Sequence, residues 1–270
     1  MSERCPIGPV RLATAFVKRD LLQAASYRVA FLWQGASLLF YVGILFFLSS
    51  AFAQAAVGGT GGYFAYAVVG FAVAEGMWGC LTSFSLQVRH DQVVGTLEAM
   101  AATRTGLGTV VVCSGLYPLL FYGLRMIVVL LVGALVGAGF GALELLRAIP
   151  ILLLSLAAFA GLGLISASMT LVVKKGDPVA SFFGALSFLL GGALYPVSVL
   201  PDWLQGIAAV LPVTHAVAAA RKVLLDGAGY ADVGFELAVL AGFAAGFGLL
   251  ALFALRWAVR LAREGGVRQY

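Results

Sequence analysis

Long apolar runs follow one another along most of this chain, and short segments rich in charged residues separate them. A helix needs about 20 mostly apolar residues to cross the roughly 30 Å hydrocarbon core of a bilayer. Six such runs occur, at residues 29–52, 63–88, 107–136, 149–173, 179–200 and 235–258. Because they are continuous and do not alternate with polar residues, they predict six transmembrane helices and argue against a transmembrane β-barrel.

The segment before the first run has a different, amphipathic pattern. Apolar side chains recur at helical spacing between residues 10 and 23, at Val10, Ala13, Phe16, Val17 and Leu21. Basic residues occupy the other side of the same helical projection, at Arg11, Lys18 and Arg19. This pattern predicts an interfacial helix lying on the membrane surface. The alternative is a solvated basic arm.

The stretch from Tyr195 to Tyr230 is cut into pieces that are too short to span a membrane, by Pro196, Pro201 and Pro212. Asp202 and Thr214 are suited to cap two apolar pieces, which would end near residues 211 and 226. Irregular backbone at membrane depth is tolerated only inside protein or along a cavity. We therefore expect a re-entrant pair of half-helices within residues 201–230 that lines or closes a pathway.

Composition supports the same class of protein. Hydrophobic residues make up 62% of the 270 residues and charged residues only 11%, whereas a soluble domain is about 25% charged. These values exclude a disordered chain, a coiled coil and a secreted disulfide scaffold. The 34 glycines suit close packing of transmembrane helices. The fold class is thus an all-α integral membrane protein, with residues 1–270 forming a single transmembrane domain.

Basic residues are distributed unequally between the two predicted faces of the membrane. Thirteen lie in the N-terminal segment 1–28, the loops after the second and fourth runs, and the C-terminal tail. The opposite loops hold three, at Arg147, Arg221 and Lys222. Cytoplasmic loops carry the excess of Lys and Arg. Both termini and the loop 89–106 are therefore predicted to be cytoplasmic, and the segment 201–230 extracellular.

Two ionisable residues, Glu75 and Arg125, lie well inside apolar runs. An unpaired charge at mid-membrane costs about 2.5–3.5 kcal/mol or more. The second and third helices are sequential and antiparallel, so we expect the two residues to be neighbours at similar depth. They form either a structural ion pair or a charged patch, on a pathway or at a contact between two membrane subunits. Arg125 reaching the headgroups instead is a third possibility.

Sequence motifs for catalysis are missing. The chain contains no GxxxxGK[ST] phosphate-binding loop and no HExxH motif, and His90 and His215 are predicted to lie on opposite faces of the membrane. Cys5, Cys80 and Cys113 have no metal or disulfide spacing. We therefore predict no catalytic residue, no metal site and no cofactor bound by this chain.

Two motifs stand out in loops at opposite faces of the predicted bundle. One is Gly95-Thr96-Leu97-Glu98, which follows Arg89 in the loop between the second and third runs. The other extends from Gly191-Gly192 to Gly227 and includes Tyr195, Pro196, Pro201, Trp203, Pro212, Thr214 and Arg221. Together with the six runs and the surface helix, these motifs resemble the permease of ABC-2 type ATP-binding-cassette exporters over nearly the whole chain.

The resemblance implies a subunit of a larger assembly in the plasma (inner) membrane of a prokaryote. The partners would be a second permease copy or a related permease, two ATPase subunits that bind ATP and Mg, and membrane lipid, without nucleic acid. Arg89, Gly95, Thr96, Leu97 and Glu98 would form the ATPase-coupling loop. The segment holding Tyr195 to Arg221 would be the extracellular gate. Arg104 departs from the pattern, since many relatives have a proline after this motif.

The leading hypothesis is ATP-driven export of an amphipathic substrate, either a drug-like compound or a lipid, because so few buried charges would not solvate a polyanion. Export of a lipid-linked polysaccharide is the alternative within the family. An ion-coupled secondary transporter with Glu75 as proton carrier is a different class, but broken helices would then be expected in both halves of the chain. A non-transporting sensor or assembly subunit is the remaining class.

Overall fold

The computed structural model describes residues 9–26, 28–51, 62–95, 107–173 and 177–264, and in these ranges it is helical without strands. The elements in chain order are α1 (Pro9–Ser26), α2 (Arg28–Ala51), α3 (Gly62–Val93), α5 (Leu107–Ser114), α6 (Leu116–Val136), α7 (Ala142–Val173), α8 (Pro178–Leu190), the 3-10 turn η1 (Val197–Val199), α9 (Asp202–Ala208), α10 (Pro212–Leu224) and α11 (Gly234–Glu264). The prediction of an all-helical membrane protein is confirmed.

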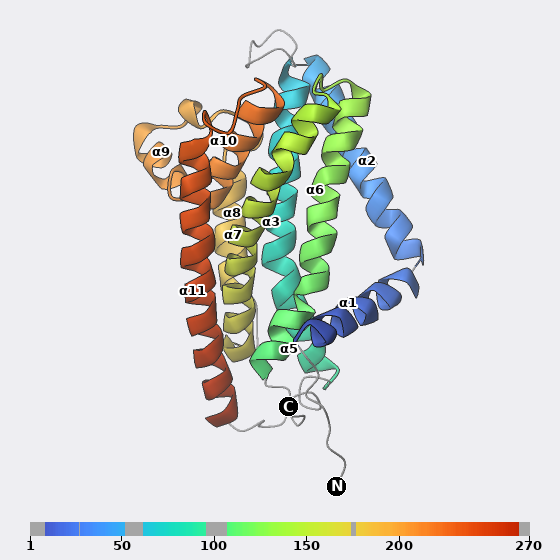
Figure 1. Cartoon of the computed structure of the whole chain (residues 1–270), viewed down its shortest axis with the longest axis vertical. Coiled ribbons are helices and arrows are strands. Elements are labelled where there is room, and N and C mark those ends of the chain that lie inside the picture. Colours follow the sequence, from blue (N-terminus) through green and yellow to red (C-terminus); the bar gives the residue numbers. More distant parts are fainter. Residues whose placement is uncertain (1–8, 27, 52–61, 96–106, 174–176, 265–270) are drawn as a thin grey trace.

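The long helices form an upright bundle in which α3 and α7 are central (Figure 1). Most side chains of α3 are buried against α6, α7, α8 and α10, whereas α2 and α11 expose most of their apolar side chains. Small residues let the helices approach closely; Gly161 of α7, for instance, faces the backbone of Phe247 and Gly248 in α11. Apolar side chains on the outside of such a bundle indicate a lipid environment.

Five helices in the described residues are long and apolar enough to cross a membrane, at Leu32–Ser50, Gly62–Val93, Gly108–Val136, Ala142–Val173 and Gly234–Leu261. A sixth crossing results only if the bent pair α9–α10 counts as one span. The fourth span begins at Ala142, seven residues before the predicted start, and the third is divided at Gly115 into α5 and α6.

The predicted fifth span, 179–200, is wrong in extent. Its helix, α8, has 13 residues and ends at Leu190, which gives a length of roughly 20 Å against about 30 Å of hydrocarbon. The chain turns at Gly192, whose φ of 69° is left-handed, and continues through η1 rather than through helix. Hydropathy could not locate this end, because the residues from Leu194 to Leu200 are still mostly apolar.

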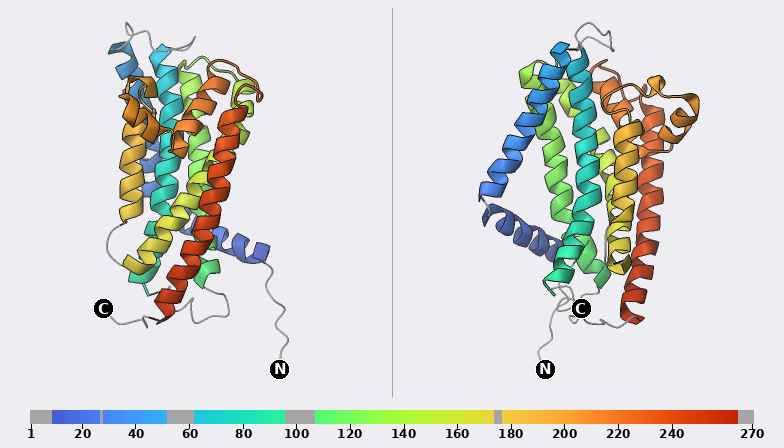
Figure 2. Two further views of the ribbon diagram at one scale, coloured as in Figure 1. Left: turned by 90° about the vertical axis from the view of Figure 1, so that its left-hand side faces the viewer. Right: turned by 180° about the vertical axis from the view of Figure 1, so that it is seen from behind.

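The two ends of the bundle differ in what they carry. α1 and the C-terminal ends of α3 and α11 lie at one end, called here the inner end after the predicted orientation, and α9 and α10 lie at the other, the outer end (Figures 1 and 2). α1 crosses the foot of the bundle and contacts α5 and α6. Arg11, Lys18 and Arg19 are exposed on α1, while Phe16 and Val17 are partly covered. This arrangement suits the predicted interfacial helix.

The orientation can be tested by cysteine accessibility. In a protein lacking Cys5, Cys80 and Cys113, we expect Gly229→Cys to react with a membrane-impermeant maleimide in intact cells. Val94→Cys should react only after permeabilisation, since it is exposed at the opposite end of the bundle. Labelling of Val94→Cys in intact cells would reverse the orientation inferred from the charges.

Candidate functional site

A sharply bent helix pair occupies the outer end of the bundle. The axes of α9 and α10 meet at 88°, across a break at residues 209–211. α10 begins with Pro212 at its first position and packs its apolar face against α3, α7 and α11. α9 contacts mainly α8 and η1 and projects to the side (Figures 1 and 2). The predicted pair of short outer helices is therefore present, with one member inserted and the other peripheral.

The predicted capping residues of this pair are wrong. The N-caps of α9 and α10 are Pro201 and Leu211, and neither makes a side-chain capping bond. Proline at the first helical position has a φ suited to a helix and lacks an N–H that would be unpaired, so Pro212 starts α10 two residues before Thr214. The hydroxyl of Thr214 is instead buried within α10, without a hydrogen-bond partner in the described residues.

Arg221 ties α10 to two other parts of the chain. Its Nη1 donates to the carbonyl of Gly192 at 2.7 Å and its Nη2 to the carbonyl of Ala193 at 2.6 Å. Nε and Nη2 both donate to the carbonyl of Tyr66 in α3, at 3.2 and 3.1 Å. The guanidinium also lies over the Tyr66 ring, 3.3 Å from its centroid. One side chain thus joins α10, α3 and the turn after α8.

The space for this contact depends on a glycine in α3. A Cβ atom at Gly70 would collide with the carbonyl oxygen of Ala193 and would lie 2.5 Å from Nη2 of Arg221. The obstruction is partly backbone, so a larger residue would displace the turn. The carbonyl groups of this turn have no partner within a helix. They need a hydrogen-bond donor from elsewhere, because an unpaired buried carbonyl costs free energy. Arg221 is that donor for Gly192 and Ala193.

The remaining residues of the predicted gate segment lie at the end of α8, before η1, on α9 and at the start of α10. The Tyr195 hydroxyl donates to the carbonyl of Leu189 at the end of α8, and Pro196 precedes η1 as its N-cap. Trp203 is 69% exposed on α9 and is not part of the core. His215 Nε2 lies 2.9 Å from the Ala209 carbonyl and so bridges the break between α9 and α10.

An ion pair that sequence reasoning missed joins α10 to α11. Lys222 Nζ lies 2.6 Å from Glu236 Oε1, and the Glu236 side chain is 10% exposed. The sequence gives little indication of this pairing, because Lys222 lies in a predicted loop and Glu236 lies 14 residues further along the chain. Tyr230 adds a contact with α7, since its hydroxyl donates to the Arg147 carbonyl at 3.0 Å. These two contacts join the segment after α10 to α11 and α7.

The structure brings Glu75 and Arg125 together. Arg125 Nε of α6 lies 2.9 Å from Glu75 Oε1 of α3, and the side chains are 13% and 19% exposed. Nε has no hydrogen-bond partner in the described residues, so the contact is an ion pair without an aligned N–H. Glu75 is 13 residues from the outer end of α3 and Arg125 is 11 from that of α6, which puts both roughly 16–20 Å deep.

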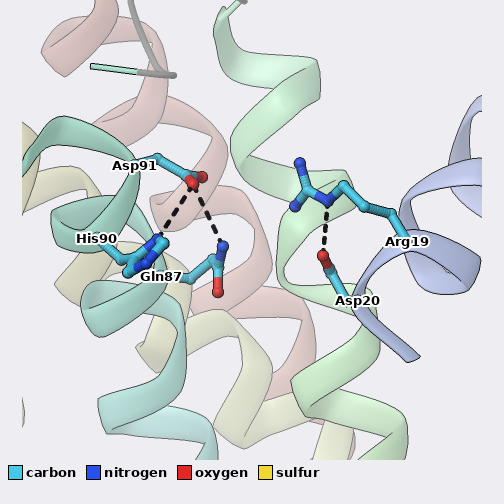
Figure 3. A network of polar contacts seen from close by, with 5 residues as sticks. All are labelled: Arg19, Asp20, Gln87, His90 and Asp91. Carbon is cyan, nitrogen blue, oxygen red and sulfur yellow. Dashed lines mark hydrogen bonds and ion pairs between the residues drawn. The ribbon is translucent and has the colours of Figure 1, made fainter. Parts of the chain in front are cut away.

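The coupling motif lies only partly within the described residues. Arg89 is exposed on the last turns of α3, and Gly95, in the turn two residues after that helix, has a left-handed φ of 75°. Thr96, Leu97 and Glu98 lie outside the described residues. Just before the motif, Asp91 is 5% exposed, and its Oδ1 lies 3.4 Å from Gln87 Nε2 and 3.7 Å from His90 Nδ1 (Figure 3).

α1 carries a buried carboxylate at the same inner end. Asp20 is 8% exposed, although it lies on the helix predicted to rest on the membrane surface. Its Oδ1 accepts a bond of 2.7 Å from Arg19 Nε (Figure 3). Helices α5 and α6 contact both α1 and α3. α1 is therefore packed on the inner end of the bundle, against the same two helices that contact α3.

Asp177 positions the start of α8. Its Oδ1 accepts from the Ala180 amide at 2.9 Å, as an N-cap, and its Oδ2 accepts from the Ser166 hydroxyl of α7 at 2.5 Å. Lys174 and Lys175 lie outside the described residues. Within the ranges that are described, no cluster of three His, Cys, Asp or Glu residues could hold a metal ion.

Comparison with known proteins identifies the family. The family model described as ABC-2 type transporter matches residues 11–225, which is most of the chain. The protein therefore belongs to the ABC-2 type transporter family and is the membrane component of an ABC transporter. The family implies association with ABC ATPase components. A comparison with curated proteins finds no match.

Proposed function

We propose that this chain is the permease subunit of an ATP-driven exporter and that it forms the translocation path together with a second copy or a related permease. Two ATPase subunits bind ATP and Mg and hydrolyse ATP at the inner end. Closure of those subunits pushes on the coupling loops, and the permeases then alternate between inward-facing and outward-facing states. The chemistry belongs to the ATPase, and this chain supplies the path and the gate.

The observation that carries this proposal is the bent pair α9–α10 at the outer end, of which α10 is inserted into the bundle. α10 is buried among α3, α7 and α11, and Arg221 holds it to α3 and to the turn after α8. Irregular backbone at membrane depth is tolerated only where protein buries it or where it lines a cavity, so a broken helix pair at one end of the bundle suits a segment that lines or closes a pathway. In this role α9 and α10 are the outer gate, and Arg221 keeps the gate closed at rest.

The Glu75–Arg125 pair supports an amphipathic substrate. It lies at mid-depth and at less than one-fifth exposure, and the buried side chains around it are mainly apolar, with few charged groups among them. A strongly charged substrate would have to lose its hydration without compensating charges. A drug-like compound or a lipid fits such a path better than an ion or a polyanion.

The proposed coupling role of Glu98 leads to a direct test. Glu98→Lys should uncouple substrate transport from ATP hydrolysis, or prevent the ATPase from assembling, because it reverses the charge of a side chain proposed to seat in that subunit. Transport should fall by at least about tenfold, the effect of a 1.4 kcal/mol loss of interaction. The measurements are co-purification of the ATPase and ATP-dependent transport in proteoliposomes.

A matched control for this variant is Glu144→Lys, which makes the same change in the first turn of α7 at the outer end. This variant should assemble with the ATPase as the unmodified protein does. Normal assembly and normal transport by Glu98→Lys would remove the residue from the coupling interface.

A further inference from the structure

A groove at the inner end of the bundle lies between α5 and the C-terminal half of α11. Its volume is about 500 Å³, and its lining includes Thr109 and Val112 from α5 with Leu252, Arg256, Val259 and Arg260 from α11. None of these residues belongs to the proposed gate, to the coupling motif or to the Glu75–Arg125 pair. The groove therefore needs an explanation of its own.

The lining changes from apolar to basic along the membrane normal. α11 descends toward the inner end. Leu252, Arg256 and Arg260 are each four residues apart, so each lies roughly 6 Å closer to the inner end than the one before it. α5 ascends from the inner end, so Thr109 lies lower than Val112. The two helices thus place their polar side chains at the inner end and their aliphatic side chains toward the membrane centre. A ligand matching this lining has an anionic head and an apolar tail.

The two arginines are available for such a ligand. Both side chains are exposed, and neither forms an ion pair or a hydrogen bond with another described residue. In contrast, Arg19, Arg125 and Arg221 each have a partner within the described ranges. A guanidinium binds phosphate oxygens in a two-pronged geometry that a lysine does not provide. An adjacent pair of arginines, one helical turn apart, offers two such donors.

The surface beside the groove faces lipid. Leu249 is 71% exposed, Phe253 is 70% exposed and Trp257 is 47% exposed on α11. Tryptophan is enriched where the hydrocarbon meets the headgroups, and arginine reaches the same level by extending its aliphatic stem. The groove consequently opens at the depth of phospholipid headgroups, next to a helix face that contacts acyl chains.

We propose that this groove binds one anionic phospholipid of the inner leaflet. Arg256 and Arg260 contact the phosphate and the anionic headgroup, the Thr109 hydroxyl donates a further hydrogen bond, and an acyl chain lies along Val112 and Leu252. The lipid would join α11 to α5 at the end of the bundle where the ATPase is proposed to act. The site is separate from the proposed outer gate and does not depend on what the transporter carries.

Trp257 provides a local reporter for the test. The protein has four tryptophans, so the parent variant keeps Trp257 and carries Trp33→Phe, Trp78→Phe and Trp203→Phe. Its fluorescence is measured in vesicles containing brominated phosphatidylglycerol or brominated phosphatidylcholine, and the relative binding constant of the two lipids is derived from quenching. We expect a preference for phosphatidylglycerol that falls about fivefold for each arginine replaced, in Arg256→Gln and in Arg256→Gln/Arg260→Gln.

A matched control removes the same charge from the same end of the protein. Arg11→Gln/Lys18→Gln alters two exposed basic residues of α1 and should leave the preference at Trp257 unchanged. Equal binding of the two lipids by the parent, or an unchanged preference in Arg256→Gln/Arg260→Gln, would overturn the proposal. Loss of ATPase co-purification in that variant without a change in lipid preference would instead assign the groove to the ATPase. Displacement of the lipid by inorganic phosphate would assign it to a free anion.

Discussion

Replacing Arg221 with methionine should release α10 from the bundle and destabilise the protein more than any other single change at its outer end. Three carbonyl groups, those of Tyr66, Gly192 and Ala193, would lose their donor. A hydrogen bond to a charged group contributes about 1.5–3 kcal/mol, and an unpaired buried carbonyl costs a further 1–3 kcal/mol. We expect a loss of at least about 3–5 kcal/mol, since these effects are only partly additive.

The measurement is the midpoint of thermal unfolding in detergent, together with transport in the assembled complex. Arg147→Met is the matched control, because it removes an exposed arginine at the same end and leaves intact the backbone carbonyl to which Tyr230 donates. It should shift the midpoint little. An equal shift in the two variants would mean that the Arg221 contacts contribute nothing specific.

A second variant disturbs the contact between Arg221 and the turn after α8 without removing the Arg221 side chain. Gly70→Ala keeps Arg221 but places a Cβ against the Ala193 carbonyl, so it should destabilise the same junction. Because both changes act on one contact, Gly70→Ala/Arg221→Met should be less destabilised than the sum of the single variants. Additive effects would show that Gly70 and Arg221 act independently.

Reversing either charge of the Glu75–Arg125 pair should produce the other large effect. Glu75→Arg would place two guanidinium groups side by side at mid-membrane, and Arg125→Glu would place two carboxylates there. Leaving a charge unpaired at this depth costs about 2.5–3.5 kcal/mol or more, so the yield of folded protein should drop strongly in each single variant. Glu75→Arg/Arg125→Glu restores opposite charges and should recover most of the yield.

The readouts are the yield of monodisperse protein and transport by the assembled complex. A double variant no better than the singles would show that the two residues act separately. Recovery of both folding and transport identifies a structural pair between α3 and α6. Recovery of folding alone would place the pair on the pathway, where the position of each charge matters to the substrate and not only to the scaffold.

Hydropathy alone predicted the number and type of most helices, because a lipid environment demands long apolar stretches and leaves few other signals. It also predicted that Glu75 and Arg125 would be neighbours, since sequential antiparallel helices place residues of similar depth side by side. The end of α8 could not be predicted in this way. It is set by the left-handed turn at Gly192, whereas the apolar sequence continues for several residues beyond it.

The Arg221 anchor shows why side-chain partners at the outer end were harder to predict. The motif singled out Arg221, but its acceptors are backbone carbonyls, which every residue has, and one of them lies 155 residues away in α3. Gly70 allows the contact through the absence of a side chain, which leaves no trace in a hydropathy pattern. Asp20 and Glu236 were missed for a related reason, because their burial results from packing between helices distant in the sequence.

The claim that this chain is the path and gate of an ATP-driven exporter is tested most directly by comparing two driving forces. The chain is reconstituted into proteoliposomes with and without its ATPase, and uptake of a fluorescent amphipathic dye is followed after adding ATP outside or imposing a proton gradient. The account predicts accumulation only with both the ATPase and ATP, and its loss when ATP hydrolysis is blocked. Accumulation driven by the proton gradient in the absence of the ATPase would contradict it and identify an ion-coupled transporter.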